Sequence, residues 1–170
     1  ERVDEATWGI TGFVYRRIRG GMMLLGRGLD ASLAPLAALL PEGETTPGRD
    51  VVVSILNGIY GDYLARSGNP LSIEMTLRQQ AGTHPTGKLL VLVHGLCMSD
   101  HQWQHEGYSH GAALADELGY TPLYLRYNSG RHIADNGEHL AERLESLIGQ
   151  WPRAVDELTI VGHSMGGLVA

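Results

Sequence analysis

From residue 72 onward the sequence predicts an α/β fold with a mainly parallel sheet. Three segments have the apolar and β-branched composition of strands, and two segments between them carry apolar residues at helical spacing. The predicted strands are 88–93, 121–127 and 157–161, and the predicted helices are 109–118 and 135–150. Strands that alternate with helices are joined by right-handed crossovers, which place the strands side by side and parallel.

The first seventy residues differ in character from the rest and are predicted to be helical. Segment 6–28 places apolar residues at helical spacing, and segment 30–40 is rich in alanine and leucine. We therefore divide the chain into an N-terminal helical region, 1–70, and a sheet-containing region, 71–170.

The clearest helix of the sequence is 47–67. Thr46 can cap it, Pro47 suits the first helical position, and the Gly-Asn-Pro sequence at 68–70 ends it. Its apolar residues recur with helical period: Val51, Val52, Ile55, Leu56, Ile59, Tyr60, Tyr63 and Leu64. A face this wide must be covered, so we expect it to pack against the sheet-containing region or the preceding helices.

The sheet is predicted to begin with an edge strand and to continue with a buried one. Ile73, Met75 and Leu77 alternate with polar residues, which is typical of a half-buried edge strand. Segment 88–93 is an apolar run without alternation, and such runs form strands that are buried on both faces.

Near the end of the chain, strand-like residues 157–161 lead directly into Gly-His-Ser-Met-Gly-Gly at 162–167. This G-x-S-x-G pattern, placed after a strand and before an apolar helix start, indicates a nucleophile elbow. The turn is so tight that the serine takes strained backbone angles, while the flanking glycines let the neighbouring strand and helix approach. We therefore predict that Ser164 is a catalytic nucleophile rather than part of a plain strand-to-helix turn.

Strand 88–93 ends at His94-Gly95-Leu96, where the loop must turn sharply. Acyl transfer places negative charge on a carbonyl oxygen, and hydrolases stabilise this charge with backbone N–H donors. We expect one donor from Met165, the residue after the nucleophile, and the other from Leu96. The alternative is that His94 and Gly95 merely end a strand.

The motifs at 93–96 and 161–167 resemble those of the α/β-hydrolase superfamily, of the lipase and esterase kind, and the resemblance covers 72–170. It implies a three-layer αβα sandwich with a mainly parallel sheet, with Ser164 as nucleophile. It also implies that the Leu96 and Met165 amides form the oxyanion hole. The supporting positions in the two loops are His94, Gly95, Gly162, His163 and Gly166. Segment 125–133 is similar to bacterial hydrolases related to lipases and to inositol-deacylase-type domains.

One departure from the family pattern concerns the catalytic triad, which runs Ser, then Asp or Glu, then His along the chain. The six residues after Ser164 include neither an acid nor a histidine, and the first residue is Glu1 rather than Met. We interpret the 170 residues as the N-terminal half of a hydrolase and expect them to be inactive alone. The triad acid and histidine would then follow Ala170.

The loop after strand 121–127 is expected to reach the same cleft, because ligands bind beyond the carboxyl ends of parallel strands. Tyr127, Arg131 and His132 are therefore candidate substrate contacts. The alternative is an ordinary turn in which Asp135 or Asn136 caps the next helix.

No metal or cofactor is predicted. His101, His105 and His110 lie near acidic residues, but their spacing does not match a zinc signature such as H-E-x-x-H. A polar loop that caps the next helix is the preferred interpretation. His163 is adjacent to the serine, and a neighbouring side chain points away from the nucleophile.

Charge and cysteine content indicate which classes of partner and which compartment to expect. The net charge of −6 and pI near 5.7 argue against a nucleic-acid surface. A lone cysteine, Cys97, forms no internal disulfide, so we expect a cytoplasmic protein. The basic segment 1–28 offers a membrane surface contact, although packing on the protein is the preferred interpretation. The sequence gives no indication of oligomeric state.

The function expected from these motifs is hydrolysis of a carboxylic ester, from a small-molecule or lipid substrate, by a serine enzyme that needs no cofactor. Two alternatives remain open. The same site serves acyl transfer to an acceptor other than water, and a fold member without catalysis serves only binding.

Overall fold

The computed structural model describes residues 47–105 and 107–170, which belong to one compact unit formed by residues 45–170. The predicted segments 6–28 and 30–40, and the proposed cap Thr46, lie outside the described residues. The proposed division at residue 70 therefore stays a prediction.

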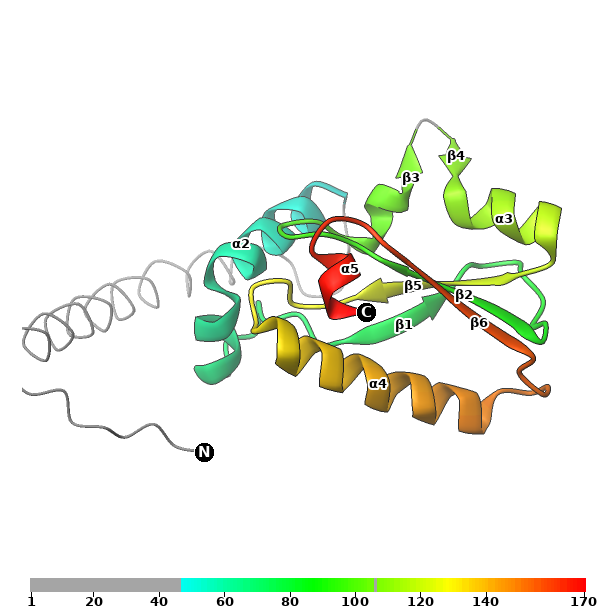
Figure 1. The fold of residues 1–170 in the computed structure, drawn as a ribbon. Coiled ribbons are helices and arrows are strands. Elements are labelled where there is room, and N and C mark those ends of the chain that lie inside the picture. The colour runs from blue at the N-terminus through cyan, green and yellow to red at the C-terminus, as the bar shows by residue number, and fades with distance from the viewer. Residues whose placement is uncertain (1–46, 106) are drawn as a thin grey trace, which may run out of the picture. The chain divides into compact units, whose positions relative to one another are not determined.

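The described elements alternate between strands and helices along most of the chain (Figure 1). In order they are α2 (Pro47–Arg66), β1 (Thr76–Gln79), β2 (Lys88–Val93), η1 (Asp100–Trp103), β3 (Gln104–His105), β4 (Tyr108–Ser109), α3 (His110–Leu118), β5 (Thr121–Arg126), α4 (Ile133–Gln150), β6 (Glu157–Gly162) and α5 (Gly166–Val169). The predicted helices 47–67, 109–118 and 135–150 and the predicted strands 88–93, 121–127 and 157–161 are confirmed within two residues. The edge strand is real but begins at Thr76, three residues later than its alternation predicted.

These residues form a mixed α/β fold around an open four-stranded sheet of order β1-β5-β2-β6. β2 is central and pairs in parallel with both β5 and β6, whereas β1 pairs antiparallel with β5. In this register Val93 lies opposite both Leu125 and Gly162. The residues that follow β2 and β6 therefore leave the sheet side by side.

Both faces of β2 are buried, which explains its unbroken apolar run. Leu89, Val91 and Val93 pack with Leu140 and Leu144 of α4 on one face. Residues 90 and 92 pack on the other face with Leu114 of α3 and Tyr124 of β5. Figure 1 shows α4 and α3 on opposite sides of the sheet.

Helix α2 forms as predicted, but its packed side is not the predicted one. Val51, Val52, Ile55 and Ile59 are exposed by 42–60%, so the described residues leave much of the predicted apolar face uncovered. The buried side is largely polar: Asp50, Val53, Ser54, Asn57 and Leu64. The buried positions do recur with helical period, but they are selected by polar contacts with residues distant in sequence, such as that of Asp50 with Arg126, rather than by apolar character. The helix is also irregular at Tyr60, with φ −117° and ψ 17°.

The buried amide of Asn57 explains how a polar face can pack. Its Nδ2 donates to the carbonyls of Val53 and Leu71, at 2.8 and 2.7 Å, and its Oδ1 accepts from the Ile73 N–H at 2.9 Å. A buried polar group that is fully hydrogen-bonded carries little penalty. α2 is thus fastened to the chain that leads into β1.

None of the helices in the described ranges is long and apolar enough to cross a membrane.

Candidate active site

Ser164 lies in the turn between β6 and α5, with φ of +53°. A positive φ is uncommon for a residue with a side chain and costs about 1–2 kcal/mol. The turn is closed by hydrogen bonds from Gly166 N–H to the His163 carbonyl (2.9 Å) and from Gly167 N–H to the Ser164 carbonyl (3.0 Å). The strained geometry predicted for Ser164 is therefore present, and its side chain is exposed.

The two glycines of the motif are required by close packing. A Cβ on Gly162 would lie 2.5 Å from the Gly167 nitrogen. A Cβ on Gly166 would lie 2.3 Å from the Val93 carbonyl oxygen and 2.7 Å from that of His94. All of these neighbours are backbone atoms, so the clash could not be relieved by moving a flexible side chain. The start of α5 is thus seated directly on the end of β2.

The loop after β2 lies against the turn at 162–167, which contains the candidate nucleophile Ser164. The His163 N–H donates to the Val93 carbonyl at 2.9 Å. The Cβ position of Gly95 is 3.2 Å from both the carbonyl oxygen and Nδ1 of His163. The two loops that sequence analysis selected are therefore in contact.

The backbone N–H groups of Leu96 and Met165 have no hydrogen-bond partner within the described part of the chain. Other amides of the same loop are used: Cys97 donates to the Ser129 hydroxyl at 3.0 Å, and Met98 donates to the Gly95 carbonyl at 3.3 Å. Two adjacent loops thus each present a free donor, as an oxyanion hole requires.

The side chain of His94 is buried and contacts the backbone of this loop. Its side chain is only 1% exposed, its Nδ1 is 2.9 Å from the Gly95 carbonyl oxygen, and its ring stacks on Tyr127 with centroids 4.4 Å apart. Burial lowers the pKa of His94 below its ordinary value, so the ring is neutral near pH 7.

The expectation that Tyr127 contacts substrate is wrong. Its side chain is 1% exposed, and its hydroxyl donates to the His94 carbonyl at 2.7 Å. Burial also raises the pKa of Tyr127, which keeps the phenol protonated. Tyr127 therefore positions the loop after β2 from inside the protein.

Arg131 and His132 are not brought to Ser164. Arg131 contacts His139 of α4, with Nη1 3.0 Å from Nδ1, and His132 Nε2 is 3.4 Å from the carboxylate of Asp62 in α2. Arg131 also lines a cavity of about 570 Å³ between the β1 approach and α4, and no residue of the nucleophile turn lines that cavity.

The segment before α4 is the ordinary turn of the alternative interpretation, with one difference. Gly130 N–H donates to the Asn128 side chain, and the Asn136 side chain donates to the Asn128 carbonyl. The N-cap of α4 is His132, so Asp135 and Asn136 lie inside the helix instead of capping it.

A network of ion pairs that joins α2, β1, β5 and η1 was not predicted from the sequence. Arg126, at the end of β5, reaches Asp50 of α2 (Nη2–Oδ1, 3.0 Å) and Asp100 of η1 (Nη1–Oδ1, 3.5 Å). Arg78 also contacts Asp100 at 2.9 Å, and His101 contacts Asp50 at 2.9 Å. Residues 50 and 126 are far apart in the sequence, so no local sequence pattern predicts their contact.

This network sets the charge state of Asp50. Burial alone would raise the pKa of this carboxyl, but the hydrogen bond and positive charge of Arg126 outweigh it and hold the pKa below its ordinary value. The ion pairs tie α2 to η1, which follows the loop after β2.

His101, His105 and His110 follow the loop after β2 in the sequence. The described residues contain no group of three His, Cys, Asp or Glu side chains that can hold a metal ion. His101 pairs with Asp50, and Ser109 caps α3 by accepting from the Ala112 N–H at 3.3 Å. The expected cap of the next helix is therefore present, and Ser109 supplies it.

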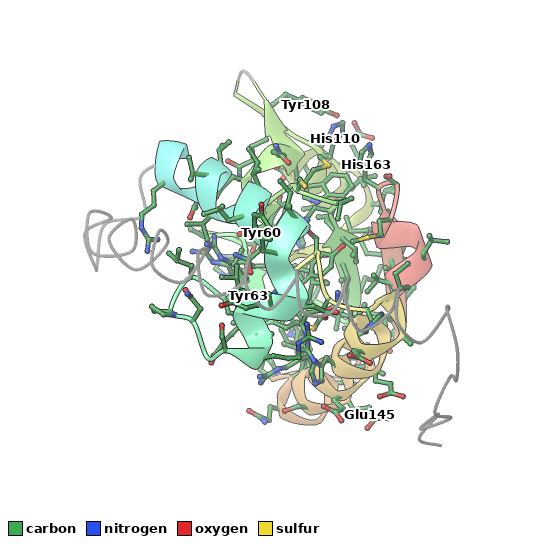
Figure 2. All side chains as sticks on the ribbon, turned by 90° about the vertical axis from the view of Figure 1, so that its left-hand side faces the viewer. Tyr60, Tyr63, Tyr108, His110, Glu145 and His163 are labelled. Atoms are coloured by element: carbon green, nitrogen blue, oxygen red, sulfur yellow. The ribbon has the colours of Figure 1, made fainter. Side chains whose placement is uncertain are left out.

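A smaller cavity, of about 190 Å³, adjoins the nucleophile turn. It is lined by His94, Met98, Gln102, Trp103, His110 and His163. Figure 2 shows His110 and His163 close together. Within the described ranges, no histidine or carboxylate hydrogen-bonds to the Ser164 hydroxyl.

The comparisons with known proteins add no identification. No protein-family model, curated protein or solved structure matches this chain.

Proposed function

We propose that the protein is a serine hydrolase of carboxylic esters, with an α/β-hydrolase fold of the lipase and esterase kind. The observation that carries the proposal is the backbone of Ser164, which has φ of +53° in a turn between a parallel strand and a helix. Natural proteins keep such strain where it serves function. The unused N–H donors of Met165, in the same turn, and Leu96, in the loop after β2, support the proposal further.

In the proposed reaction the Ser164 hydroxyl attacks the carbonyl carbon of the ester. Negative charge develops on the carbonyl oxygen, and the N–H groups of Leu96 and Met165 stabilise it. The tetrahedral intermediate collapses and expels the alcohol, and water then releases the acyl group.

A serine hydroxyl needs a general base to act as a nucleophile. In the proposed family the triad acid and histidine follow the serine along the chain. We propose that residues after Ala170 supply both. Among the described residues no hydrogen bond joins the His163 side chain to the Ser164 hydroxyl, so His163 is not our candidate for this base.

Substitution of the nucleophile tests this proposal in the full-length protein. Ser164→Ala should lower kcat for p-nitrophenyl esters by at least about 10³-fold, since loss of a triad serine removes the covalent route. Ser146→Ala is the matched control, because Ser146 lies on α4 and its hydroxyl only accepts from Gln150. Equal activity of both variants would refute the assignment.

A further inference from the structure

The cavity of about 570 Å³ lies between two walls that the fold holds in place. One wall is the approach to β1, where the Asn57 side chain fixes the backbone by accepting from the Ile73 N–H at 2.9 Å. The other wall is α4, which packs on the sheet through Leu140 and Leu144. The volume is within the range of about 300–1,000 Å³ that is usual for ligand sites, and such sites are largely formed before the ligand binds.

One side of α4 contributes polar and basic lining. Four of its residues line the cavity at intervals of three and four positions, which places them on the same side of the helix: Asn136, His139, Arg143 and Ser146. Arg131, just before α4, also lines the cavity. Its Nη1 donates to Nδ1 of His139 at 3.0 Å, since a guanidinium has no acceptor. Two guanidinium groups thus belong to the cavity wall.

The charged groups of this lining are balanced in number but are not paired with one another. Glu74, before β1, and Glu142, on α4, add two carboxylates to the guanidinium groups of Arg131 and Arg143. Among the residues that the structure describes, the side chains of Glu74, Glu142 and Arg143 form no hydrogen bond or ion pair. Groups of both signs therefore remain available to a ligand.

The cavity also contains an acceptor on a buried side chain. Asn136 is 1% exposed and donates from Nδ2 to the Asn128 carbonyl at 3.0 Å, which leaves Oδ1 as the free atom of its amide. Oδ1 accepts no hydrogen bond from the described residues and, unlike Nε2 of His94, is not sealed from water. Because Asn136 lines the cavity, a ligand there can supply the missing donor.

We propose that this cavity binds a small zwitterion, such as a short peptide with free ends. Its carboxylate contacts Arg143, and its ammonium contacts Glu74 or Glu142. An N–H of the ligand donates to Oδ1 of Asn136. A ligand with charge of only one sign is attracted by one pair of these groups and repelled by the other. None of the described residues of the nucleophile turn lines this cavity, so the inference does not depend on the proposed hydrolysis.

Glycine peptides test the proposal in the full-length protein, with binding followed by NMR through the amide resonances of α4. Diglycine, triglycine and tetraglycine offer an increasing separation between the two charges, and at least one of them should bind saturably at millimolar concentrations. The N-acetyl form of that peptide lacks the ammonium, and its C-terminal amide lacks the carboxylate. Each should bind about tenfold or more weakly, since each loses a charge-assisted contact.

Substitutions identify the groups that make these contacts. Arg143→Gln should reduce the preference for the free peptide over its amide to about threefold or less, and Glu74→Gln combined with Glu142→Gln should do the same for the preference over the N-acetyl form. Arg153→Gln and Glu145→Gln are the matched controls, because both residues are exposed and neither lines the cavity, and they should keep both preferences. All of the replaced side chains are exposed, so each variant should fold, and circular dichroism checks this.

Absence of saturable binding by all three peptides would overturn the proposal, as would equal affinity for the free and the capped peptides. Preferences that survive both Arg143→Gln and the double glutamate variant would show that the peptide binds elsewhere, and would overturn it as well.

Discussion

The turn at 162–167 and helix α2 both contact the segment after β2, but they are held there by different forces. The turn is fixed by backbone hydrogen bonds and by glycines that touch backbone, such as Gly166 against Val93. α2 is fixed largely by buried polar and charged side chains, above all Asp50 and Asn57. The turn should therefore be sensitive to added volume, whereas α2 should be sensitive to lost charge.

The largest effect is expected from Asp50→Asn. It removes the closer of the two carboxylates that Arg126 contacts, and the side chain of Arg126 is only 16% exposed. Removal of one partner of a buried ion pair costs about 3–5 kcal/mol of folding stability, and the remaining contact with Asp100 should keep the loss at the lower end of that range. Chemical denaturation of the two proteins measures the difference.

Asp62→Asn is the matched control on the same helix. Asp62 pairs with His132, which is 77% exposed, so its loss should change stability by less than about 1 kcal/mol. Similar effects of the two substitutions would show that the Arg126 network does not hold α2 in place.

Added volume should destabilise the nucleophile turn. Gly166→Ala places a Cβ 2.3 Å from the Val93 carbonyl oxygen and should cost about 1–3 kcal/mol, with loss of any esterase activity. Gly167→Ala is a close control, since the nearest atom to its Cβ is 3.8 Å away. If Gly166→Ala were as stable as Gly167→Ala, the described close packing of the start of α5 against the end of β2 would be incorrect.

Acid should weaken the fold through His94. Its pKa is lowered in the folded protein, so the unfolded chain binds a proton first as pH falls below about 6.5. Stability from this group is complete above that pH and declines below it, by up to about 1.4 kcal/mol per pH unit until the folded pKa is reached. His94→Phe should show a shallower decline between pH 6.5 and 5; an identical slope would mean that His94 is not buried as described.

The smallest effect concerns backbone strain at Ser164. Glycine accepts a positive φ without cost, although it also adds entropy to the unfolded chain. Ser164→Gly should therefore be about 0.5–1 kcal/mol more stable than Ser164→Ala, which retains the strain. Thermal unfolding compares the two, and a more stable alanine variant would argue against a strained turn.

The fold around the site was predictable where one short segment carries the whole signal. The apolar run at 88–93 requires burial on both faces, and the G-x-S-x-G turn needs glycine wherever its Cβ would meet backbone. Both constraints are local, so both are visible in the sequence.

The packing of α2 was not predictable because it depends on partners distant in sequence. The number of apolar residues favoured the valine-rich face as the packed side of α2. The side with Asp50 is buried instead, because Asp50 forms an ion pair with Arg126 of β5. Similarly, Tyr127 directly follows β5, where a side chain can face either the cleft or the interior. Only the tertiary structure shows that its hydroxyl donates a hydrogen bond to the His94 carbonyl.

The central claim is that Ser164 is an activated nucleophile, and covalent labelling tests it most directly. The full-length protein is treated with a fluorophosphonate at neutral pH, digested and analysed by peptide mass spectrometry. We expect a single phosphonyl adduct on Ser164, which disappears in Ser164→Ala and persists in Ser146→Ala. Absence of an adduct on folded protein, or an adduct on another serine that survives Ser164→Ala, would contradict the claim.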